Sequence, residues 1–269
     1  MNSKKEQKLH QEITFAGNIQ EYLREFVYGG IDGAVTTFAV VAGAVGANLD
    51  PAIIIILGFA NLLADGFSMS VGAYLSSKSD QENYNKHKAV EYWEVDNLPQ
   101  KERQEIEDIY RDKGFEGELL QQVVDVITAD KDRWVDEMMK DELNMMEETK
   151  SPFKIGLATL ISFIVVGFIP LMIYVYDYFR DTNFDVFLWT SVFTGLAFAV
   201  VGWMKSYVNQ TNVFKSVGET LGLGFLAALV AYYVGDFLEG LINFSLDENY
   251  RSCHPKNGSN RSRVPSETI

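Results

Sequence analysis

The chain has 269 residues, of which 47% are hydrophobic and 22% are charged, and its formal net charge is −14. This acidic balance argues against a nucleic-acid partner, because a phosphate backbone is bound by Lys and Arg side chains. Cys253 is the one cysteine, which excludes an intramolecular disulfide and a zinc site of several thiolates.

The charge is concentrated in one part of the chain. Residues 80–148 contain 21 acidic and 9 basic residues, whereas the other 200 residues contain 16 acidic and 14 basic ones. The two compositions predict two kinds of structure, an acidic water-exposed unit and a set of apolar segments.

Five apolar runs interrupt the less charged part of the chain. A bilayer core of ~30 Å requires about 20 helical residues. The first run reaches this length if its helix begins near Phe26, which places Asp32 inside the membrane. A large soluble helical core is the alternative, but so many runs in one chain favour membrane spans. Each run contains at most one charged residue, and the runs cover 33–49, 51–77, 155–176, 186–204 and 216–235.

The distribution of Lys and Arg in short loops predicts the orientation. The N-terminal arm contains Lys4, Lys5, Lys8 and Arg24, and the loop between the first two runs contains neither Lys nor Arg. We therefore expect the N-terminus and the long insert to be cytosolic. The predicted organisation is an N-terminal arm at 1–25, two spans within 26–78, a cytosolic metal-binding insert at 79–150, three spans within 151–245 and a disordered tail at 246–269.

The insert has the pattern of three or four amphipathic helices. The first continues from the second span to about Asp96, and Pro99 interrupts the helical hydrogen-bond ladder. A second helix is expected at 100–113, a third from about Glu116, and a last one at 129–148. The predicted fold class is thus an all-α polytopic membrane protein with five transmembrane helices and an acidic helical insert.

Carboxylates recur at helical spacing in the insert. Glu91 and Glu94 are three residues apart on one predicted helix, and Glu102 and Glu105 are three apart on the next. Residues at this spacing share a helix face, and two such faces packed antiparallel would gather four carboxylates. Like charges repel one another unless a cation compensates. The pattern predicts a metal site of the kind seen in helical bundles, with a solvated acidic face as the alternative.

The last predicted helix adds Glu142, with Met138 and Met139 within one turn before it. Methionine sulfur is a soft ligand and carboxylate oxygen a hard one. The mixture suits a borderline divalent ion such as Fe²⁺ better than Ca²⁺ or Mg²⁺. The alternative is that both methionines fill a hydrophobic core.

A few polar residues lie within the apolar runs. Ionisable groups at membrane depth are unfavourable and typically mark a transport pathway. Asp65 shares a helix face with Met69 and with Asn61, each four residues away, and Glu25 continues the stripe of Asp32 toward the cytosolic side. Asp32 and Met69 offer one hard and one soft ligand from two helices. For Asp32, a helix N-cap at the membrane interface is the alternative.

Two long strings resemble one known family. Residues 24–38, REFVYGGIDGAVTTF, resemble the first span of the vacuolar iron transporter family, and residues 63–76, LADGFSMSVGAYLS, resemble its second. The resemblance runs through residues 20–240, and the order of two spans, an acidic insert and three further spans also fits. The plant nodulin-like relatives lack this insert.

The resemblance implies a homodimeric five-span transporter rather than an enzyme, with no cofactor and no catalytic residue. It would export cytosolic Fe²⁺ in exchange for protons, with Mn²⁺ as an alternative substrate. The membrane would be that of a vacuole or another acidic organelle in a eukaryote, and the plasma membrane in a bacterium. Asp32 and Met69 would be pathway ligands, while Asn61 occupies a polar pathway position although an amide cannot exchange a proton. The cytosolic metal site would comprise Glu91, Glu94, Glu102, Glu105, Glu142, Met138 and Met139.

A function of another class is also compatible with the residues. A membrane-anchored, ferritin-like iron store or sensor would bind iron in the insert and move nothing across the membrane. Such a store would keep working after Asp65 and Met69 are changed.

Overall fold

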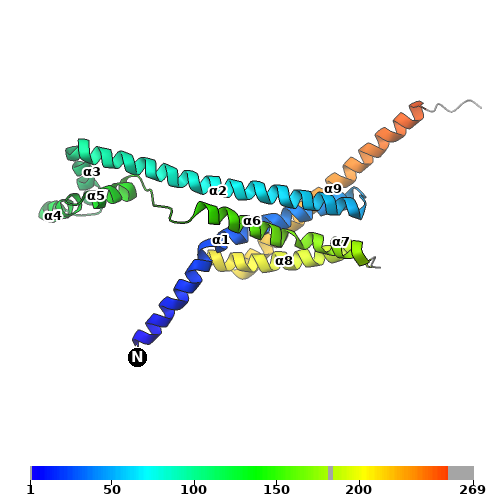
Figure 1. The fold of residues 1–269 in the computed structure, drawn as a ribbon, viewed down its shortest axis with the longest axis horizontal. Helices are drawn as coiled ribbons and strands as arrows, with labels where there is room; N and C mark the ends of the chain where they lie inside the picture. Colours follow the sequence, from blue (N-terminus) through cyan, green and yellow to red (C-terminus); the bar gives the residue numbers. More distant parts are fainter. Residues whose placement is uncertain (1, 181–183, 254–269) are drawn as a thin grey trace, which may run out of the picture. The chain divides into compact units, whose positions relative to one another are not determined.

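The computed structural model describes the backbone of residues 2–180 and 184–253, and the side chains of residues 22–180 and 184–243. Within these ranges the regular elements are helices, which confirms the all-α prediction (Figure 1). In chain order they are α1 (Asn2–Gly46), α2 (Pro51–Asn97), α3 (Pro99–Asp112), α4 (Gly117–Thr128), α5 (Lys131–Glu137), the π-helical turn η1 (Met138–Glu142), α6 (Pro152–Gly167), α7 (Ile169–Arg180), α8 (Val186–Asn209) and α9 (Val213–Cys253).

The helices include the apolar segments that a polytopic membrane protein requires. Four of them are long and apolar enough to cross a membrane, and a bent pair makes up to five. The bent pair is α6 with α7, which meet at an angle of 47°. Pro170 lies in the first turn of α7, where it has no N–H to continue the hydrogen-bond ladder of α6. The apolar run predicted as one span at 155–176 is therefore divided between two helices that meet at a bend.

The chain divides into two compact units. The first consists of Met1–Gly29 with Gly66–Ile161, and the second of Gly30–Asp65 with Ser162–Ile269. The first unit contains the acidic segment, and the second contains most of the apolar helices.

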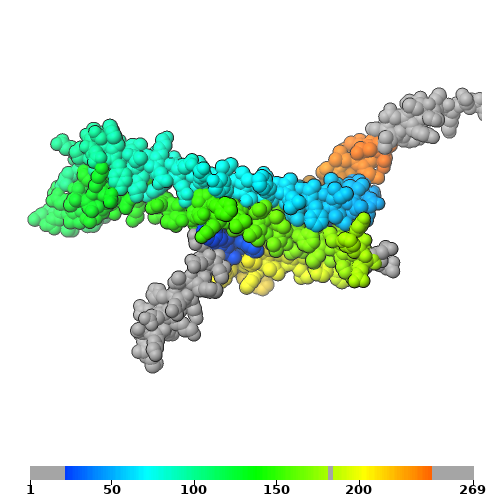
Figure 2. Space-filling view, in the orientation of Figure 1, coloured from blue at the N-terminus to red at the C-terminus, as the bar shows by residue number. Residues whose placement is uncertain are grey.

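The acidic segment folds around a small hydrophobic core in the first unit. Helix α3 packs on α4, and α4 packs on α5. Ile106, Val124 and Val135 are fully buried in this core. The space-filling view shows α3, α4 and α5 packed with the adjacent end of α2 (Figure 2). The apolar faces of these helices, which the sequence pattern predicts, therefore pack together to form the core.

The last helix of this segment is shorter than predicted. Instead of running from 129 to 148, α5 passes into the π-helical turn η1 and ends at Glu142. Asn144 then adopts a left-handed conformation with φ of 52°, and the Met145 N–H donates to the Met139 carbonyl at 2.8 Å. This wide turn closes the helix, since a left-handed residue cannot continue it.

In the second unit, glycines allow helices to approach closely. A Cβ atom on Gly33 would lie 2.5 Å from the Phe163 carbonyl oxygen, which brings α1 against α6. On α9, Gly235 lies against the Gly43 carbonyl of α1 in the same way. Small residues drive helix association in membranes because backbones then pack directly on one another.

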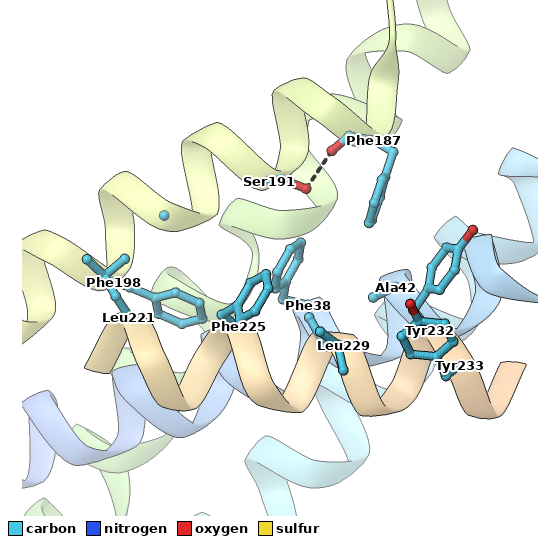
Figure 3. Close-up of a pocket in the computed structure, with 12 residues that line it drawn as sticks. Phe38, Ala42, Phe187, Ser191, Phe198, Leu221, Phe225, Leu229, Tyr232 and Tyr233 are labelled. Carbon is cyan, nitrogen blue, oxygen red and sulfur yellow. Dashed lines mark hydrogen bonds between the residues drawn. The ribbon is translucent and has the colours of Figure 1, made fainter. Parts of the chain in front are cut away.

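An apolar cavity of about 450 Å³ lies among α1, α8 and α9 of this unit (Figure 3). Figure 3 shows Phe225 beside Phe38, and Tyr232 with Tyr233 at one end of the cavity. The Ser191 hydroxyl donates to the Phe187 carbonyl at 2.8 Å. The residues that line the cavity include no carboxylate and no thioether, so it does not contribute to a metal site.

Helix α9 extends beyond the predicted fifth span. Its apolar part is Val213–Asn243, and its backbone remains helical to Cys253. Residues 246–253 are therefore helical, although a disordered tail was predicted from 246. The rest of that predicted tail, 254–269, lies outside the described residues.

The close packing of α9 against α1 predicts opposite effects of two alanine substitutions. In Gly235→Ala the new methyl group meets the Gly43 carbonyl, and we expect a loss of stability of about 1–3 kcal/mol. In Gly240→Ala nothing lies within 4 Å of the new atom, so the higher helix propensity of alanine should leave stability equal or higher. Thermal unfolding of the detergent-solubilised chain measures both, and equal midpoints would contradict the packing.

Candidate metal centre

Three carboxylates of the acidic segment meet at one point. One oxygen from each of Glu91, Glu94 and Glu102 lies within 4.8 Å of the others. Helix α2 ends at Asn97 and α3 begins at Pro99, so the chain reverses within two residues. The reversal places the first turn of α3 beside the last turns of α2. Three of the four carboxylates on the two predicted faces are therefore brought together, and Glu105 is not one of the three.

Two of these carboxylates are buried and have oxygens that accept no hydrogen bond from the described residues. Glu91 is 4% exposed and Glu102 is 1% exposed. Among the described residues, Glu91 Oε2 and both carboxylate oxygens of Glu102 accept no hydrogen bond. The Lys101 ammonium lies 3.5 Å from Glu102 and 3.0 Å from Glu105, but its side chain is 58% exposed. Burial of an incompletely paired carboxylate is strongly unfavourable, and the three converging oxygens could hold a metal ion.

Together with burial, the negative charges of the other predicted ligands, Glu105 and Glu142, raise the pKa values of Glu91 and Glu102. Burial, followed by the charges of Glu142 and Glu102, raises the pKa of Glu91 to about 7. Burial likewise raises the pKa of Glu102 to about 7, with Glu105 as the next cause. The pKa of Glu142 is raised by burial and then by Glu105. The five predicted glutamates, Glu94 included, therefore form one electrostatic cluster.

The two methionines of the predicted site lie in the hydrophobic core. Met138 is fully buried and Met139 is 1% exposed, and both pack in the cluster that contains Trp134. This is the core-filling alternative that the sequence left open, so their role as ligands stays a prediction. Glu142 lies one turn further along η1 and is exposed. Such π-helical turns occur often at functional sites.

Three of the predicted pathway residues belong to the second unit. Asp32 of α1 and Asp65 of α2 are half-buried and near enough for their charges to interact. Asn61 is half-buried, and its Nδ2 makes no hydrogen bond to a described residue. Asp32 lies inside the continuous helix α1, so the N-cap alternative is wrong.

The other two predicted pathway residues, Glu25 and Met69, meet in the first unit. They line a cavity of about 270 Å³ together with Thr159. Glu25 Oε2 is buried and accepts no hydrogen bond from a described residue, and Oε1 lies 3.4 Å from Lys150 Nζ. Sequence reasoning missed Lys150 and Thr159, because no local pattern relates residues 125 positions apart. Since Asp32 belongs to the other unit, its pairing with Met69 stays a prediction.

Comparison with known proteins places this arrangement in a family. The VIT family model matches residues 23–236, which include every carboxylate described above. A Toxoplasma gondii protein named vacuolar iron transporter is 34% identical over 84% of this chain and 77% of its own length. A Plasmodium falciparum protein of the same name is 32% identical over 83% and 85%. Vacuolar iron transporter 1 of Arabidopsis thaliana is 28% identical over 83% and 88%. The chain therefore belongs to the VIT family.

Proposed function

We propose that this protein moves Fe²⁺ out of the cytosol across a membrane, into a vacuole or another acidic compartment. The observation that carries the proposal is the convergence of Glu91, Glu94 and Glu102. Glu91 and Glu102 have buried oxygens that accept no hydrogen bond from the described residues. The names of the relatives supply the identity of the ion. The protein would be a secondary-active transporter and not an enzyme, with Mn²⁺ as a further substrate.

The acidic cluster would capture the ion on the cytosolic side. A divalent cation neutralises two of the mutually repelling carboxylates and satisfies oxygens that the protein leaves without partners. Binding requires the carboxylates in their ionised form, so capture releases protons. Met138 and Met139 would adapt the site to Fe²⁺ if their thioethers turn from the core toward the glutamates.

The ion would then pass to the polar residues of the membrane helices. Glu25 and Met69 would receive it at their shared cavity, and Asp32 and Asp65 would bind it deeper in the membrane. Protons from the acidic side would displace the ion from these carboxylates, which makes the protein an antiporter. We also infer a homodimer, in line with the family resemblance. An iron store or sensor would have no use for half-buried carboxylates within membrane spans.

A substitution at Asp32 distinguishes a transporter from an iron store. In proteoliposomes with an acidic interior, we expect Asp32→Asn to reduce Fe²⁺ uptake by about tenfold or more, because an amide neither neutralises the ion nor exchanges a proton. Asp236→Asn is the matched control, since Asp236 is an exposed acid on α9. A store or sensor would show no uptake in the unmodified protein, and undiminished uptake in Asp32→Asn would remove Asp32 from the pathway.

Substitution of Glu102 predicts opposite effects on binding and stability. Glu102→Gln removes a ligand, and we expect Mn²⁺ binding by the full chain in detergent to weaken about tenfold. It also removes a buried charge, so the metal-free protein at pH 8 should gain about 1–3 kcal/mol. Glu118→Gln, at an exposed position of α4, should change neither. Mn²⁺ titration measures the affinity, and thermal unfolding measures the stability. A variant that loses both Mn²⁺ affinity and stability would indicate a purely structural role for Glu102.

The raised pKa values predict how pH acts on the cluster. Glu91 and Glu102 hold protons up to about pH 7 in the folded state, well above the ordinary value of 4.5. The metal-free folded protein therefore binds more protons than the unfolded chain between these values, and its stability should fall as pH rises from 5 to 8. Mn²⁺ binding should tighten about tenfold per group from pH 6 to 8. Denaturation curves at low and high pH test the expected fall in stability, and Mn²⁺ titrations at the same pH values test the expected rise in affinity. Mn²⁺ binding that does not depend on pH would contradict the burial of Glu91 and Glu102.

A further inference from the structure

The ion pair between Glu25 and Lys150 has no role in the cycle described so far. Lys150 Nζ lies 3.4 Å from Glu25 Oε1, with 28% and 17% of the two side chains exposed. Two charges at this depth attract each other more strongly than a pair in open water. Glu25 also forms part of the cavity wall beside Met69, so the pair stands where a metal ion would need the same carboxylate.

The carboxylate of Glu25 is only half satisfied by this lysine. Oε2 is buried, and it accepts no hydrogen bond from the described part of the chain. The adjoining cavity of about 270 Å³ is large enough to hold several waters. Thr159 and Met69 supply an oxygen and a sulfur to its wall. The space beside the free oxygen therefore admits a partly hydrated divalent ion.

Lys150 reaches Glu25 from a fixed backbone. Gln81 of α2 donates two hydrogen bonds from Nε2, to the carbonyl oxygens of Glu148 and Lys150, each at 2.9 Å. These bonds attach to α2 the segment that connects the acidic cluster with α6. Arg24 also lines the cavity, but it is exposed and its guanidinium lies outside this ion pair. The cation held against Glu25 is therefore the Lys150 ammonium.

We propose that Lys150 is a tethered counter-cation whose ammonium occupies Glu25 until a divalent ion replaces it, and that this competition sets the affinity of the cavity for metal. The inference rests on the proposed function, since it assigns Lys150 a part in the uptake of the transported ion. At equal distance a divalent ion attracts the carboxylate twice as strongly as the ammonium does. The ion also gains Oε2 and the Met69 thioether as ligands. Lysine suits such exchange because its charge is compact and its four-carbon stem is flexible.

The test compares three variants of the full chain in proteoliposomes with an acidic interior. Lys150→Gln removes the competing charge, Lys150→Arg keeps it, and Lys154→Gln makes the same charge change at an exposed position of α6. We expect Lys150→Gln to lower the KM for Fe²⁺ uptake about two- to fivefold. Lys154→Gln should stay near the unmodified protein, whereas Lys150→Arg should keep or raise its KM, because a guanidinium is harder to displace from a carboxylate than an ammonium. A residue with only a structural role would lower flux at every concentration and would not lower the KM.

Equilibrium binding of Mn²⁺ gives a second measure that does not depend on flux. In a Glu102→Gln background, which weakens the acidic cluster, Lys150→Gln should bind Mn²⁺ more tightly by a similar factor. Retained flux with an unchanged or higher KM would overturn the role of Lys150 and leave transport standing. Absence of flux in the unmodified protein would contradict the proposed function, while the Mn²⁺ titration would still decide the role of Lys150. If Lys150→Gln does not fold, Lys150→Met keeps the aliphatic stem and makes the same comparison.

Discussion

The first unit contains a concentration of negative charge that its own lysines neutralise only in part. Burial of Glu91 and Glu102 opposes folding, and the nearby charges of Glu105 and Glu142 add repulsion. The hydrophobic core of α3, α4 and α5 must stabilise the unit enough to offset this. A buried charge without a full partner is weak support for stability, so its presence favours a functional reason. A divalent cation is the ligand that would remove both the repulsion and the desolvation penalty.

A structural feature can be predicted from this sequence when the residues that form it lie within one helix or one turn. The spans follow from hydropathy, and the Glu91–Glu94 and Glu102–Glu105 faces follow from the helical period, because both patterns lie within one helix. The turn at Pro99 then suffices to bring the two faces together. The break before Pro170 was visible in the sequence, yet hydropathy alone predicts one continuous span there. The early end of η1 depends on the left-handed Asn144, and the ion pair of Lys150 with Glu25 depends on tertiary folding, so neither has a local signal.

The two units differ in how many polar and charged side chains they contain. The second unit contains few polar groups in its spans and packs its helices through glycine contacts such as Gly33 on Phe163. Such packing needs no hydrogen bond between helices, so Asp32 and Asp65 are not required to hold the span together. Their retention at membrane depth is better explained by an ion that passes than by stability. The first unit contains many charged residues, and water at its outer surface stabilises a denser cluster of carboxylates than the membrane spans could hold.

Two lysines occupy equivalent chemical positions in the first unit. Lys101 pairs with Glu102 and Glu105, and Lys150 pairs with Glu25, so each proposed metal carboxylate region has an ammonium beside it. An arginine would bind a carboxylate with two parallel hydrogen bonds and would be harder to displace. A lysine contributes a single compact charge that can withdraw toward water when a divalent ion arrives. At these two regions the carboxylates would then exchange one cation for another when a divalent ion arrives.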